Sequence, residues 1–277
     1  MSLFVFFSFC KLIFTTLNLT YLSNQEVNML RTALVGLLFV TSSVLASESV
    51  ELKYQSPKGE DEQAAYQLIV ESGINQQFSA LVEEVFPFNN AMTLVYGGDE
   101  GPLYDPSIHT LFIPYSFILE AQHYFSQNMP ADEVNQGVLD TLMHTLLHEA
   151  GHALVADIEI PILGREEDAV DNLATIIMLE YLKNGAQAAI NAADMFSYES
   201  EEGSEYYDFG EYVGDHSFDL QRYFSTLCLV YGRDPKAHED LLNEVEGDYL
   251  AEQKEVCEEN YQQLRVNWHQ YLKEDKN

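Results

Sequence analysis

The chain has 277 residues, of which 47% are hydrophobic and 12% aromatic, a composition typical of a folded globular protein and not of a disordered one. Its formal net charge at pH 7 is −32, because 45 acidic residues stand against only 13 basic ones. Binding to the phosphate backbone of nucleic acids and docking on anionic lipid both need Lys and Arg, so neither kind of partner is expected.

The N-terminus carries the features of an export signal. Residues 29–46 combine one basic residue, a short apolar core and a small-residue cleavage pattern that ends at Ala46. We interpret residues 1–28 as an upstream mis-start, with translation beginning at Met29; an N-terminal membrane anchor is the alternative. The sequence therefore predicts one domain over residues 47–277, secreted or periplasmic, with no stable membrane insertion after the signal is cleaved.

The periodicity of apolar residues predicts a mainly helical α+β domain with a small sheet near its N-terminal end. Strands rich in β-branched and aromatic residues are predicted at 91–97 and 108–115, separated by a loop. We expect 108–115 to be the edge strand, along which an extended peptide could pair. Helices are predicted over residues 61–73, 76–86, 116–127, 131–157, 165–183, 216–231, 236–245 and 249–272.

Two features of the C-terminal half leave alternatives open. Residues 197–215 hold seven acidic residues and no basic one, which indicates a solvated loop or, alternatively, a calcium-binding segment. Cys228 and Cys257 are the two cysteines that remain after the N-terminal segment is removed. In an exported chain they are expected to form a disulfide between two predicted helices, the alternative being two buried free thiols.

Residues 148–152 read HEAGH and lie inside the predicted helix 131–157. On a helix, His148 and His152 share one face and can offer imidazole nitrogens to one ion, while Glu149 is turned roughly 100° away. This is the HExxH arrangement, in which zinc polarises a carbonyl and activates a water whose proton the glutamate accepts. Gly151 costs the helix about 1 kcal/mol relative to alanine, so we expect another element to pack closely over it. The alternative is two surface histidines without a metal.

The third ligand is expected from the helix that follows. A catalytic zinc needs three protein ligands and one open position. Glu166 and Glu167 both lie near the apolar stripe of the predicted helix 165–183, so position alone does not choose between them. Asp171 follows Glu167 at i+4 on the same face, where it can accept the second N–H of a ligand histidine, and this favours Glu167. A charged helix N-terminus with no metal role is the alternative.

His216 is the candidate stabiliser of the transition state. It follows the acidic segment and begins a predicted helix, so its imidazole can enter the site from outside the two zinc helices and donate to a developing oxyanion. A capping or supporting role for this histidine is the alternative.

Three stretches resemble a bacterial family of predicted metallopeptidases of otherwise unknown function, whose members are similar to zincins of the gluzincin type. They are LYDPSIHTLFIPYSF, TLLHEAGHALVADIEIPILGREEDAVD and DHSFDLQRYFSTLCLVYGRDP, and the resemblance covers most of residues 85–236. It implies a zincin-like domain and zinc-dependent cleavage of a peptide or protein substrate, and similar gluzincins carry Glu-xxx-Asp on their second helix. Gly214-Asp215 stands where the family usually has a Glu before the downstream histidine.

These observations predict an exported zinc metallopeptidase in which His148, His152 and Glu167 hold the ion and Glu149 is the general base. One alternative is a catalytically silent zinc-binding module with an interaction or inhibitory role. Another is a zinc amidohydrolase that acts on a non-peptide amide. Glu149 favours an enzyme, because a purely structural zinc site does not need that base.

Overall fold

The structure is a computed structural model that describes residues 49–202, 211–245 and 247–273. The expected mis-start (1–28) and signal peptide (29–46) lie outside these residues, so both interpretations stay predictions. Within the described residues, no helix has the length and apolar character needed to cross a membrane.

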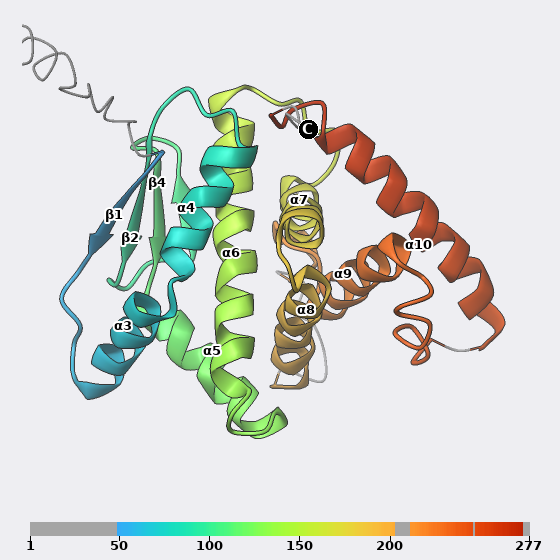
Figure 1. Cartoon of the computed structure of the whole chain (residues 1–277), viewed down its shortest axis with the longest axis horizontal. Helices are drawn as coiled ribbons and strands as arrows, with labels where there is room; N and C mark the ends of the chain where they lie inside the picture. The colour runs from blue at the N-terminus through green and yellow to red at the C-terminus, as the bar shows by residue number, and fades with distance from the viewer. Residues whose placement is uncertain (1–48, 203–210, 246, 274–277) are drawn as a thin grey trace, which may run out of the picture. The chain divides into compact units, whose positions relative to one another are not determined.

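A four-stranded sheet precedes most of the helices (Figure 1). The strand order is β1-β2-β4-β3; β1 and β4 run parallel to β2, and β3 runs antiparallel to β4. Alternate residues of β2 are buried, as the two-residue period of a strand requires. The strands are β1 (Val50–Tyr54), β2 (Met92–Tyr96), β3 (Leu103–Asp105) and β4 (Thr110–Ile113).

The predicted edge strand was wrong. β4, which lies within 108–115, is an inner strand, and the edge next to it is β3, inside the segment predicted to be a loop. Pro102 and Pro106 bracket β3 and give the segment the composition of a turn. Pairing with β4, which local sequence does not reveal, makes it a strand. β1 was not predicted either.

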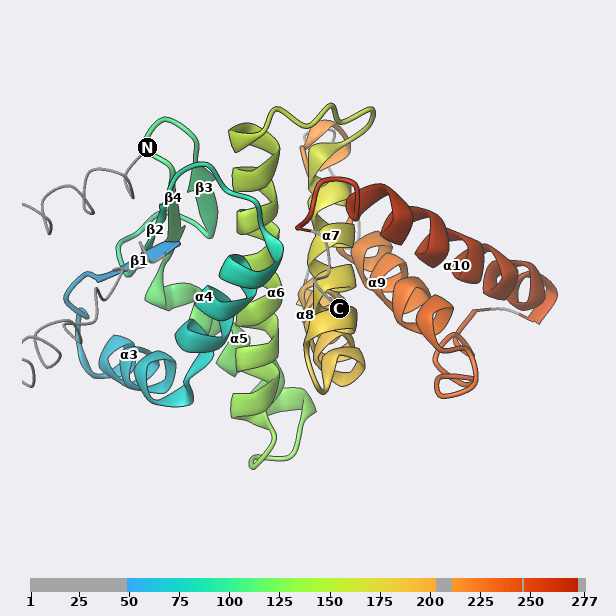
Figure 2. The ribbon, with the colours of Figure 1, turned by 45° about the horizontal axis from the view of Figure 1, so that its top comes forward.

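Helix α6 lies between two groups of elements. The sheet and α3–α5 lie on one side of it and α7–α10 on the other (Figures 1 and 2). Because α6 is covered on both sides, 15 of its 24 residues are buried, including polar ones. The helices are α3 (Glu60–Ser72), α4 (Ile74–Val85), α5 (Tyr115–Asn128), α6 (Val134–Asp157), α7 (Glu166–Tyr181), α8 (Gly185–Glu202), α9 (Asp219–Arg233) and α10 (Gly247–Trp268), with a short 3-10 helix η1 (Glu211–Val213).

This mainly helical α+β architecture confirms the predicted fold class, with two corrections among the helices. Helix α8 was not predicted, and its last residues fall in the expected acidic loop, of which 203–210 lie outside the described residues. Its end stays helical where Tyr198 packs edge-on against Phe125, with ring centroids 5.7 Å apart. The helix predicted over 236–245 is wrong: backbone bonds there span three residues, as from the amide of Val245 to the carbonyl of Leu242, and form consecutive turns.

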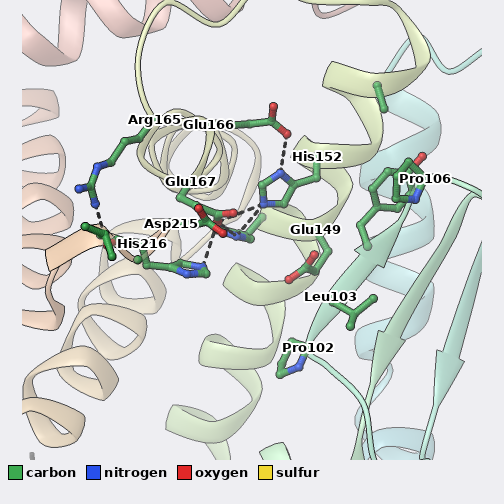
Figure 3. A pocket seen from close by; sticks show the side chains of 15 residues that line it. Pro102, Leu103, Pro106, Glu149, His152, Arg165, Glu166, Glu167, Asp215 and His216 are labelled. Atoms are coloured by element: carbon green, nitrogen blue, oxygen red, sulfur yellow. Dashed lines mark hydrogen bonds and ion pairs between the residues drawn. The ribbon is translucent and has the colours of Figure 1, made fainter. Parts of the chain in front are cut away.

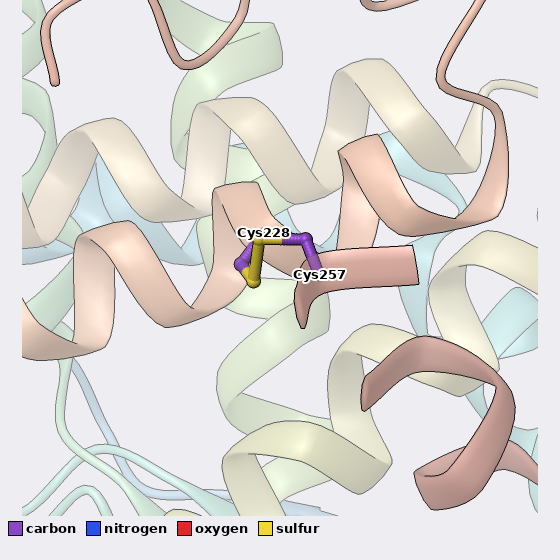
Figure 4. The surroundings of a disulfide bond; sticks show 2 residues. All are labelled: Cys228 and Cys257. Atoms are coloured by element: carbon purple, nitrogen blue, oxygen red, sulfur yellow. A yellow bond between two sulfur atoms is a disulfide. The ribbon is translucent and has the colours of Figure 1, made fainter. Parts of the chain in front are cut away.

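The predicted disulfide is confirmed (Figure 4). Cys228 on α9 and Cys257 on α10 are joined, with their Cα atoms 4.9 Å apart. Gly232, one turn further along α9, makes room for this close approach, since a Cβ there would lie 2.1 Å from the Cys257 carbonyl oxygen. The disulfide therefore joins two helices whose backbones already lie close together at Gly232.

Candidate metal centre

The HEAGH residues lie on helix α6, between the sheet with α3–α5 on one side and α7–α10 on the other. His148 and Glu149 are buried, with 5% and 6% of their surfaces exposed, and His152 is partly buried. The Nε2 atoms of His148 and His152 are 3.2 Å apart, as expected for two residues one helical turn apart that face the same point.

Gly151 brings α7 against this part of α6. A Cβ at that position would lie 2.9 Å from the Cβ of Val170, closer than real Cβ contacts. The predicted close packing over Gly151 therefore exists, and the packing element is α7. Val170 and Leu173 on the buried face of α7 make this contact, so the first turn of α7 lies beside the histidines.

The first turn of α7 places Glu167 between the two histidines (Figure 3). Its Oε2 atom is 3.1 Å from His148 Nε2 and 3.2 Å from His152 Nε2. Three atoms held about 2.1 Å from a tetrahedral zinc ion stand about 3.4 Å apart. The three side chains therefore already have nearly the spacing that such an ion needs.

The second nitrogen of each histidine is bound by a carboxylate. His148 Nδ1 donates to Asp171 Oδ1 at 2.7 Å, and His152 Nδ1 donates to Glu166 Oε1 at 2.8 Å. An ionised carboxylate only accepts, so both Nδ1 atoms carry a hydrogen, and Nε2 is the atom that each neutral ring can offer to an ion. Glu166 and Glu167, which the sequence could separate only by the position of Asp171, thus make different contacts.

Arg222 on α9 supports this arrangement from behind. Its Nε and Nη2 donate to the two oxygens of Asp171 at 2.8 and 2.9 Å, a bidentate pair. Burial raises the pKa of Asp171, but the hydrogen bond with His148 and the charge of Arg222 outweigh it and hold that pKa well below its usual range. Asp171 is therefore a fixed anion that orients the His148 ring.

The chemistry of this donor set fits a cation. Three possible ligand atoms, two imidazole nitrogens and a carboxylate oxygen, converge on one point. Burial lowers the pKa of His148, yet hydrogen bonds with Asp171 and Glu167 raise it to about 9, so positive charge is strongly favoured at this point. A metal ion held by these residues would supply that charge in place of the proton.

Glu149 lies beside the metal-binding face without joining it. Figure 3 shows its carboxylate apart from the dashed contacts of Glu167, on the side of Pro102 and Leu103. Burial raises the pKa of Glu149, against the opposing effect of His148 and His152. A buried carboxylate with a raised pKa, next to an ion site, is well suited to accept a proton.

His216 reaches the same point from the segment before α9. Its Nε2 is 3.0 Å from Glu167 Oε2, while 53% of its side chain is exposed. Among the described residues, His148, Glu167 and His216 form a group whose possible ligand atoms all lie within 4.8 Å of one another. Arg165, at the start of α7, holds the segment by donating from Nη1 to the His216 carbonyl oxygen at 2.8 Å.

A cleft of about 710 Å³ opens over these residues. One wall is the edge strand β3 with Pro102 and Pro106, and the opposite wall is the segment 213–216 (Figure 3). The floor is made of the histidines of α6 and the first turn of α7. Both the size and the position between the two halves of the domain are typical of a substrate site.

Sequence reasoning missed three contributors to the site. Glu166 was considered only as a rival ligand, and Arg222 and Arg165 were not singled out at all. Arg222 lies within the resembling stretch DHSFDLQRYFSTLCLVYGRDP, but only the packing of α9 on α7 brings it to Asp171.

Comparison with known proteins agrees with this geometry. No curated protein and no solved structure matches the chain. A family model with the description "Putative metallopeptidase" matches residues 54–272, which include every described site residue discussed above. The chain therefore belongs to this metallopeptidase family, DUF4344.

Proposed function

We propose that this protein is an exported zinc peptidase in which His148, His152 and Glu167 hold the ion. The observation that carries the proposal is the convergence of their three possible ligand atoms within 3.2 Å of each other. Two imidazoles and one carboxylate are a ligand set of catalytic zinc, whereas Mg²⁺ and Ca²⁺ prefer oxygen alone. Zinc bound there would polarise the substrate carbonyl and lower the pKa of a coordinated water.

Glu149 is the proposed general base. Its position beside the ligands lets it take the proton of the attacking water and then pass it to the leaving amine. Its burial keeps bulk water away and favours the protonated form midway through the reaction. This placement supports an enzyme over a catalytically silent zinc-binding module.

His216 is the proposed donor to the oxyanion that develops on the scissile carbonyl. The hydrogen bond from Arg165 fixes its backbone, while the side chain, 53% exposed, lines the cleft. A preplaced N–H donor in such a site contributes about 10²–10³-fold to the rate.

The shape of the cleft favours a peptide over a small non-peptide amide. β3 is the edge of the sheet and lines the cleft, so an extended chain can hydrogen-bond along it and lie across the zinc ligands. The disulfide supports export, since such bonds persist in oxidising compartments. A secreted or periplasmic protein acting on peptides or proteins is the proposal that combines these features.

The decisive experiment tests hydrolysis by the purified full chain on a mixture of proteome-derived peptides, with and without a chelator. Glu149→Gln should keep one zinc per chain while losing about 10²–10⁴-fold in kcat, because an amide keeps the shape but cannot accept the proton. Glu159→Gln, a glutamate of the loop between α6 and α7, is the matched control and should stay active. Full activity of Glu149→Gln, or zinc-independent cleavage, would contradict the mechanism.

The ligand assignment has its own test in zinc affinity. Glu167→Ala should lose zinc at concentrations where Glu166→Ala still holds it, because Glu166 contacts only the far nitrogen of His152. Asp171→Ala should be intermediate, since it orients His148 without touching the ion. The reverse order of Glu166 and Glu167 would make Glu166 the ligand.

A further inference from the structure

A second, smaller pocket of about 260 Å³ opens from the cleft beside Glu149. The two cavities share Pro102, His148, Glu149 and His216 as lining residues, so a substrate in the cleft has direct access to the pocket. At about 30 Å³ per water, the volume equals roughly nine waters, enough for the seven or so non-hydrogen atoms of one long side chain.

The wall of the pocket combines an apolar part with unsatisfied polar groups. Phe117 on α5, with Met195 and Phe196 on α8, provides apolar surface for an aliphatic stem. Thr141 on α6 is 95% buried, and its Oγ1 has no hydrogen-bond partner within the described part of the chain. A buried hydroxyl without a partner costs free energy, so this wall requires a polar ligand atom or a water.

Two carboxylates besides that of Glu149 line the pocket. Glu199 on α8 lines it and makes no hydrogen bond or ion pair with any described residue, and Glu120 on α5 adds a second carboxylate. Arg222 also lines the pocket, but its bidentate bonds to Asp171 already balance its charge. Its guanidinium is held further by the Phe196 ring, 3.9 Å away.

Burial makes the Glu199 carboxylate costly to ionise without a partner. It raises the pKa of Glu199 to about 7, with Asp219 and Glu120 adding to the rise and Arg222 opposing it. A cation that enters the pocket would stabilise the ionised form and gain a charge-assisted hydrogen bond.

We propose that this pocket binds a lysine or arginine side chain of the substrate next to the scissile bond, with Glu199 receiving its charged end and Thr141 accepting a further hydrogen bond. The inference rests on the proposed peptidase function, since the cleft aligns the substrate with the pocket. An acidic side chain would face Glu199 and Glu120 and be repelled. A purely apolar one would leave Glu199 and Thr141 buried without partners, which is the larger source of discrimination in such sites.

The activity test compares peptides that differ at one position next to the cleaved bond, carrying Arg, Lys, Leu or Glu. The wild-type protein should cleave the Arg and Lys peptides at least tenfold better than the others. Glu199→Gln should lose most of this preference, because the neutral amide no longer attracts the charged end of the substrate side chain. Glu201→Gln, two residues on in the same helix and exposed, is the matched control and should keep the preference.

A binding test separates this inference from the proposed function. n-Butylguanidine carries the charged group without a bond to cleave, so calorimetry reads its affinity whether or not any peptide is hydrolysed. Glu199→Gln should weaken it at least tenfold and Thr141→Val several-fold, with circular dichroism reporting that each variant is folded. Zinc-dependent cleavage at equal rates on all four peptides would contradict the pocket assignment, and so would n-butylguanidine affinity that neither substitution changes. Either result would leave the proposed peptidase function uncontradicted. If no peptide is cleaved but n-butylguanidine still binds and Glu199→Gln weakens that binding, the proposed function is contradicted and the pocket assignment is supported.

Discussion

Gly151→Ala tests how the contact between two helices sets the metal site. The added Cβ would stand 2.9 Å from the Cβ of Val170, about 0.5 Å short of the 3.4 Å at which ordinary contacts begin. Val170 is fully buried, so α7 must move away as a body. Overpacking of this kind costs about 1–3 kcal/mol, while alanine returns about 1 kcal/mol of helix propensity. The net loss of folding stability is therefore small, about 0–2 kcal/mol.

The effect on zinc should be larger than the effect on stability. Glu167 stands one helical turn before Val170, so a shift of α7 by about 0.5 Å displaces its carboxylate from the two histidines by a similar distance. Zinc–ligand distances tolerate deviations of only about 0.2 Å. We expect zinc affinity to fall about 10–100-fold, the range found when groups that orient ligands are disturbed.

The assay is competition for zinc against a chromophoric chelator, together with the thermal midpoint of the zinc-free protein. Val170→Gly in the Gly151→Ala background removes both clashing atoms, the Cβ and the Cγ1 of Val170, and should restore most of the affinity, although a buried isopropyl group is lost. Unchanged zinc affinity in Gly151→Ala, or a loss that Val170→Gly does not relieve, would refute the reasoning that α7 is positioned through this contact.

Three further predictions concern stability. Replacing both Cys228 and Cys257 by Ser opens a loop with a sequence separation of 29 residues and should lower the free energy of unfolding by about 3.6 kcal/mol. The thermal midpoint should then fall by roughly 7–14 °C, and an unchanged midpoint would contradict this account. Burial raises the pKa of Asp194 to about 6, above its unfolded value, so the wild type loses stability as the pH rises through 4–6. In denaturant titrations, Asp194→Asn should therefore be more stable than the wild type above pH 6, by on the order of 1 kcal/mol, and equally stable at pH 4. Asp171→Asn should lower the free energy of unfolding by about 3–5 kcal/mol even in the zinc-free protein, because Arg222 is left as a buried charge without its partner. A loss of stability seen only with zinc present would count against that pairing.

Periodicity along single helices was enough to predict the part of the site that α6 and α7 carry. The i+4 spacing of His148 and His152 needs only helix geometry, and the i+4 step from Glu167 to Asp171 needs only a helical wheel. Gly151 was also informative, because a glycine inside a long helix indicates a close neighbour. These inferences use contacts within one turn, which sequence determines directly.

The contributors that the sequence did not reveal depend on contacts between distant segments. Arg222 is one of several polar residues on α9 until that helix packs on α7, and Glu199 sits in an acidic run that composition alone assigns to solvent. β3 is three residues long between prolines, and only its partner β4 makes it a strand. In each case the deciding interaction joins residues far apart in the chain.

The edge strand β3 bears on how the protein behaves at high concentration. An open edge offers unpaired N–H and C=O groups to any other chain and is a site of aggregation. Within the described residues β3 pairs with β4 alone, yet it spans only three residues, and Pro102 and Pro106 on either side lack the N–H that a longer ladder would need. Two copies of the protein can therefore gain few bonds by joining these edges, and their net charge of −32 each opposes the encounter. The sheet keeps an edge that a single bound strand can use without offering one on which a fibril can grow.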